Sequence, residues 1–250
     1  MATVAAQSSK PAKLATGLPG RSFDHMFFSG MALAMLATVF VGFARTYYLA
    51  GVFHAPLPSR IIHLHGAVFS SWILLLVAQT SLASSGRVDI HRRLGIAGFF
   101  LACLMVILGV LAATDALVRG NPVGLDPKAF YIIPLTDMLM FATLTFFAFR
   151  SRLNPSAHKR LILVATIGLL GAAIVRWPLA IVHRNNPRAT LFSYAFLLIL
   201  LTYDLWSTHK FHRATFWAGA FLIFLQQIRL PIGHTAAWHS FASWVQSLAR

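Results

Sequence analysis

The chain has 250 residues, of which 58% are hydrophobic and only 11% are charged. Soluble globular domains carry about 25% charged residues, so this composition excludes such a domain and predicts a protein embedded in a lipid bilayer. Lys and Arg number 21 against 6 Asp and Glu, but most of the basic residues lie between apolar runs. That pattern indicates topology signals and contacts with anionic membrane lipids, not nucleic-acid binding.

The apolar runs, taken in chain order, predict an all-α integral membrane protein with a bundle of about seven transmembrane helices. Residues 1–25 are small, polar and basic and predict a flexible tail. The last expected span ends in Gln226, Gln227 and Arg229, and without it the count is six. Residues 232–250 predict an amphipathic segment on the membrane surface. The expected spans are residues 26–44, 61–83, 94–114, 129–149, 161–182, 189–206 and 214–231.

The connections between spans predict the orientation. Those on the side of the N-terminus carry twelve Lys and Arg, and those on the other side carry eight. Because cytoplasmic loops carry the excess of basic residues, we expect a multi-pass protein of the cell inner (cytoplasmic) membrane with its N-terminus in the cytoplasm and its C-terminus outside. Three of the cytoplasmic connections also contain a basic cluster led by histidine, which indicates a weak repeat of helix pairs.

Several ionisable residues fall inside the outer halves of the spans, where each costs about 2.5–3.5 kcal/mol on insertion scales and often marks function. They predict an outer-leaflet polar pocket for an anion or a lipid head group. Asp137 and Arg176 lie at similar depths when the helices rise 1.5 Å per residue, which predicts an ion pair between spans four and five. The expected lining residues are Arg45, His65, Asp137, Arg176 and Arg229.

Histidines near the span ends predict a second kind of site, because a pair of them can hold haem b as axial ligands. The candidates are His65, His91, His158 and His183. His91 and His158 open spans three and five, and together with His212 they would instead form a three-histidine metal site. The sequence leaves both possibilities open.

Two motifs carry a resemblance to known proteins. HRRLG at residues 91–95 and HKRL at residues 158–161, followed by Arg176-Trp177, resemble a group of uncharacterised bacterial multi-pass membrane proteins. A more distant similarity is to the membrane b-type cytochromes, in which histidines near span ends hold haem. The resemblance implies haem binding or electron transfer. Two alternatives stay open, a transporter or binding protein that uses the outer polar pocket, and a metal-dependent lipid-modifying enzyme similar to seven-span membrane hydrolases.

Overall fold

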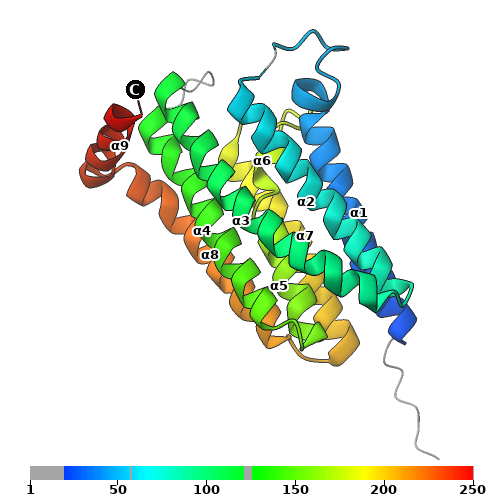
Figure 1. Cartoon of the computed structure of the whole chain (residues 1–250). Coiled ribbons are helices and arrows are strands. Elements are labelled where there is room, and N and C mark those ends of the chain that lie inside the picture. Colours follow the sequence, from blue (N-terminus) through cyan, green and yellow to red (C-terminus); the bar gives the residue numbers. More distant parts are fainter. Residues whose placement is uncertain (1–19, 57, 121–125, 250) are drawn as a thin grey trace, which may run out of the picture.

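The computed structural model describes residues 20–56, 58–120 and 126–249. This part of the chain is helical (Figure 1), and the fold class predicted from the sequence is confirmed. The elements in chain order are α1 (Arg21–Phe43), the π-helical turn η1 (Ala44–Tyr48), α2 (Arg60–Ser84), α3 (Val88–Arg119), α4 (Pro127–Arg150), α5 (Pro155–Ile167), α6 (Gly171–Ile174), α7 (Asn186–Thr208), α8 (Arg213–Gly233) and α9 (Ala236–Leu248).

Seven stretches of helix in the described residues are long and apolar enough to cross a membrane, as the sequence predicts. The last of them, Arg213–Gly233, includes the glutamines and the arginine that made it doubtful. The fifth is discontinuous, because α5 ends at Ile167 and the single turn α6 continues it to Ile174. The span therefore ends earlier than the predicted residue 182.

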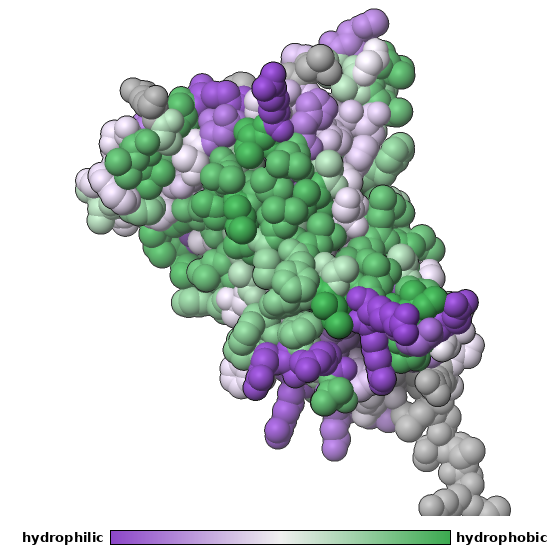
Figure 2. All heavy atoms as spheres, viewed as in Figure 1, coloured by the Kyte–Doolittle hydropathy of each residue, from purple (hydrophilic) through white to green (hydrophobic). Residues whose placement is uncertain are grey.

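The ends of the bundle form two faces. We define the N-terminal face as the end where α1 begins and where the connections α2–α3, α4–α5 and α7–α8 lie, and the C-terminal face as the end that carries α9 (Figure 1). Figure 2 shows apolar side chains over the middle of the molecule and hydrophilic ones gathered at its two ends. This distribution fits a bilayer whose interfaces lie at the two faces.

Close packing of small and flexible side chains holds the helices together. Met35, Met105 and Phe141 are completely buried in the core between α1, α3 and α4. At Gly42 an added Cβ would lie 2.3 Å from the carbonyl oxygen of Ala173. Only glycine allows α1 to approach the broken fifth span this closely, which is a common use of glycine in membrane bundles.

The two ends of the described chain are both helical, α1 at the start and α9 at the end. Residues 1–19 of the predicted tail lie outside the described residues, and residues 21–25 form the first turn of α1. At the other end α9 docks Ala242 against α3 and α4 and leaves Phe241 and Trp244 exposed. Such a helix fits a membrane interface.

Candidate functional site

His91 and His158 occupy equivalent places at the N-terminal face. Each is the fourth residue of its helix, His91 in α3 and His158 in α5. The Nδ1 atom of His91 lies 3.3 Å from the carbonyl oxygen of Gln79 in the preceding helix α2, and Nδ1 of His158 lies 2.8 Å from the carbonyl oxygen of Ala148 in the preceding helix α4. Both histidines thus reach across a helical hairpin, and the two hairpins repeat one arrangement.

These contacts fix one proton on each imidazole. A carbonyl oxygen only accepts hydrogen bonds, so Nδ1 of each ring carries a proton and donates. The two rings are 6.4 Å apart between centroids and nearly perpendicular, at 86°. Both side chains are half-buried. The structure therefore brings together two imidazoles, each held through Nδ1 by a backbone carbonyl of the preceding helix.

A buried ion pair joins α5 to α7, two residues along α5 from His158. Arg160 donates from Nε and Nη2 to Oδ1 of Asp204 in α7 at 2.8 and 2.6 Å, and the two side chains are only 3% and 0% exposed. Thr215 of α8 donates to the other carboxylate oxygen, and Ser156 accepts from Arg160. Every charged group of this network has a partner, as a buried charge requires.

A second ion pair joins α1 to the same region. Lys159 of α5 donates to Asp24, and the hydroxyl of Tyr203 in α7 donates to the other oxygen of that carboxylate at 2.7 Å. The ammonium of Lys159 also lies 4.2 Å from the centre of the Phe28 ring. The consecutive residues Lys159 and Arg160 therefore tie α5 to two different helices, α1 and α7.

His212 does not join His91 and His158. Its Nδ1 accepts a hydrogen bond from the backbone N–H of Ala214 and so caps the amino end of α8, while its Nε2 lies 3.2 Å from Oγ of Ser156. Burial lowers the pKa of the His212 imidazole, and the nearby Arg160 lowers it further. No group of three histidine, cysteine or acidic side chains able to hold a metal ion occurs in the described ranges, so the predicted three-histidine site is wrong.

The predicted ion pair between Asp137 and Arg176 is also wrong. Asp137 accepts instead from Arg229 of α8 at 2.8 Å, and Arg229 donates a second hydrogen bond to Thr190 of α7 at 3.0 Å. Arg176 follows the end of α6, donates to the carbonyl of Ala172 and lies over the ring of Phe43. The reason is the early end of the fifth span, which leaves Arg176 beside α1 and not beside α4.

The remaining candidates have separate neighbours. Arg45, in η1, lies 5.3 Å from the centre of the Phe53 ring. His65 stacks on Phe69 at 4.0 Å and keeps a buried Nδ1 without a hydrogen-bond partner among the described residues. His183 is exposed, with Nδ1 3.2 Å from the carbonyl oxygen of Trp177. Of the five predicted pocket residues, the structure joins only Asp137 and Arg229 by an ion pair.

Asp204, the most deeply buried charged residue in the described part of the chain, was not predicted from the sequence. It lies in the sixth span, where the residues before it are mostly apolar. One signal was present: Asp204 and Arg160 both lie close to the N-terminal face, at the end of the sixth span and the start of the fifth. A lone carboxylate at that level needs a cationic partner, and Arg160 was an available one.

The chain was also compared with known proteins. No protein family, no curated protein and no solved structure matches it.

Proposed function

We propose that this multi-pass membrane protein binds haem b through His91 and His158 and transfers electrons. The observation that carries the proposal is the close approach of the two imidazoles, whose ring centroids are 6.4 Å apart. Two imidazoles that bind one metal ion from opposite sides, at about 2.0–2.1 Å each, have centroids roughly 6 Å apart. The separation thus fits a single ion between the rings.

The surroundings of the two rings support a metal-binding role. Histidines that ligate metals almost always donate their other ring N–H to a carbonyl or carboxylate, which fixes the tautomer and raises the basicity of the ligating nitrogen. The carbonyls of Gln79 and Ala148 would do so here. A bis-histidine donor set is a known form of haem ligation. When bound, haem would supply reversible one-electron transfer, and the two side chains would hold the iron.

The test is the absorption spectrum of protein purified in detergent from cells supplied with haem, before and after reduction with dithionite. We expect a Soret band and sharpened α and β bands in the reduced protein. His91→Ala and His158→Ala should each reduce the haem content by tenfold or more. His183→Ala is the matched control, because that side chain is exposed at the opposite face, and it should leave the spectrum unchanged.

Two results would overturn the proposal. One is a colourless protein that does not take up haem in reconstitution. The other is a haem spectrum that survives both His91→Ala and His158→Ala. Size-exclusion chromatography of each variant separates loss of the haem site from loss of the fold.

The proposal includes a place and an orientation, the cytoplasmic membrane with the N-terminus in the cytoplasm. The excess of basic residues at the N-terminal face supports it. Reporter enzymes fused to the C-terminus provide the test, since a reporter that needs an extracytoplasmic location should be active and one that needs the cytoplasm should be inactive. The reverse pattern would overturn this orientation.

A further inference from the structure

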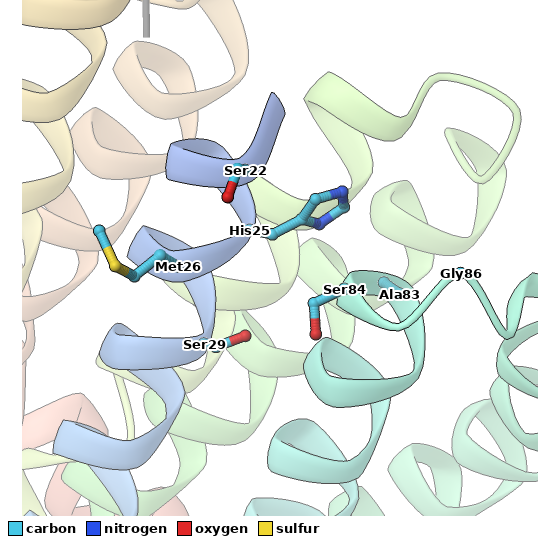
Figure 3. Close-up of a pocket in the computed structure, with 7 residues that line it drawn as sticks. All are labelled: Ser22, His25, Met26, Ser29, Ala83, Ser84 and Gly86. Carbon is cyan, nitrogen blue, oxygen red and sulfur yellow. The ribbon is translucent and has the colours of Figure 1, made fainter. Parts of the chain in front are cut away.

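An open groove of about 670 Å³ lies at the N-terminal face, between the start of α1 and the end of α2. Figure 3 shows His25 and Ser29 projecting from α1 toward the end of α2 that carries Ser84. Residues of α1 and α2 line the groove, and the turn at Gly86 forms part of its rim. Its lining residues are Ser22, His25, Met26, Ser29, Ala83, Ser84 and Gly86.

We propose that this groove binds the anionic head group of a membrane phospholipid. The lining offers the hydroxyls of Ser22 and Ser29 and one imidazole as hydrogen-bond donors and contains no carboxylate. The third serine, Ser84, already donates to the carbonyl oxygen of Ser81. The hydroxyl oxygen of Ser29 is buried and has no hydrogen-bond partner among the described residues. A buried hydroxyl without a partner costs about 1–3 kcal/mol, and a phosphate oxygen in the groove would remove that cost.

The charges in the α2–α3 turn, which forms part of the rim, are mostly positive. Arg87, Arg92 and Arg93 lie in this turn and the first residues of α3 and are exposed, against one exposed carboxylate, Asp89. Basic pockets between transmembrane helices are typical binding sites for anionic lipid head groups. The nearest acidic residue on α1, Asp24, does not oppose this, because its carboxylate binds Lys159 and Tyr203 on α5 and α7.

The amino end of α1 also favours binding of an anion in the groove. α1 is preceded by Gly20, which has no side chain to cap the helix, and the second helical residue, Ser22, lines the groove. The amino end of a helix carries a partial positive charge and favours anions. Because α1 and α2 are both membrane-spanning helices, a ligand between their ends lies at the level of the lipid head groups, which favours a lipid over a soluble anion.

The experiment is native mass spectrometry of the detergent-purified full chain, titrated with phosphatidylglycerol, with zwitterionic phosphatidylcholine, or with inorganic phosphate. We expect phosphatidylglycerol to bind at least tenfold more tightly than phosphatidylcholine, and Ser29→Leu, which removes the hydroxyl and fills the groove, to abolish that preference. The matched control is Ser71→Leu on the exposed side of α2, where the serine is bonded to its own helix. It should bind as the wild type does.

A second variant, Arg92→Gln with Arg93→Gln, changes only exposed side chains and should reduce the preference at least threefold even if Ser29→Leu fails to fold. Equal binding of the two lipids, or an unchanged preference in these variants, would overturn the proposal. Inorganic phosphate that displaces phosphatidylglycerol at micromolar concentration would assign the groove to a soluble anion instead. The outcome does not depend on haem, because lipid binding can be measured with or without it.

Discussion

The two faces of the bundle use buried charge differently. Near the C-terminal face Asp137 and Arg229 form a pair with one additional partner, Thr190. At the N-terminal face Arg160 and Asp204 are almost completely buried, and a second ion pair, a helix cap and the two neighbouring histidines lie on the same or adjoining helices. The pair near the C-terminal face joins α4 to α8, whereas those at the N-terminal face join α5 to both α1 and α7.

The largest effect should follow from breaking the buried ion pair at the N-terminal face. Asp204→Ala leaves the guanidinium of Arg160 buried without its carboxylate, and the loss of one partner of a buried pair costs about 3–5 kcal/mol. We expect a large drop in the unfolding temperature in detergent. Arg119→Ala, which removes an exposed pair with Asp115 on one helix, is the control and should change the stability by less than about 1 kcal/mol. Equal effects of the two variants would contradict the difference between buried and exposed pairs.

A smaller effect is expected near the C-terminal face. Asp137→Ala should cost about 1–3 kcal/mol, less than Asp204→Ala, because the Asp137 side chain is 17% exposed whereas that of Asp204 is 0% exposed. The double variant Asp137→Arg with Arg229→Asp should recover part of the loss seen in either single reversal, measured as unfolding temperature. Asp137→Arg combined with Arg176→Asp should recover nothing. If stability recovered only in the double variant Asp137→Arg with Arg176→Asp, the ion pair predicted from the sequence would be correct after all.

The smallest effect concerns the cap of α8. His212→Ala removes the acceptor for the Ala214 N–H and should cost about 1 kcal/mol, whereas His212→Asn, with another good capping residue, should cost less. The pKa of His212 is below the ordinary 6.5 in the folded protein, so its contribution to stability is complete above pH 6.5 and is lost as the pH falls below that value. The wild type should therefore lose more stability than His212→Asn between pH 7.5 and 5.5. Parallel pH curves would show that His212 has no such role.

Much of the fold follows from the sequence. Apolar runs of about 20 residues predict the seven spans because the bilayer fixes their length, and the histidine-led clusters mark the starts of α3 and α5. The break after Ile167 was not predicted, since that segment is as apolar as an unbroken span. This break explains why the partner predicted for Asp137 was wrong. Depth counted along an unbroken ideal helix places Arg176 inside the membrane.

The site was predictable only in part. His91 and His158 were candidates from their places at the starts of two spans, but periodicity along one helix says nothing about which faces of two helices meet. Their carbonyl partners, Gln79 and Ala148, come from the preceding helices and depend on how tightly each hairpin packs. Asp204 could have been paired with Arg160 by comparing depths, because both ends of that pair lie near one membrane surface.

The central claim is that His91 and His158 together hold one haem iron, and electron paramagnetic resonance of the oxidised protein tests it most directly. We expect the low-spin ferric signal of an iron with two imidazole ligands, and its conversion to a high-spin signal or its disappearance in His91→Ala and in His158→Ala, with His183→Ala unchanged. A high-spin iron in the wild type, or a low-spin signal that persists in both variants, would contradict the claim.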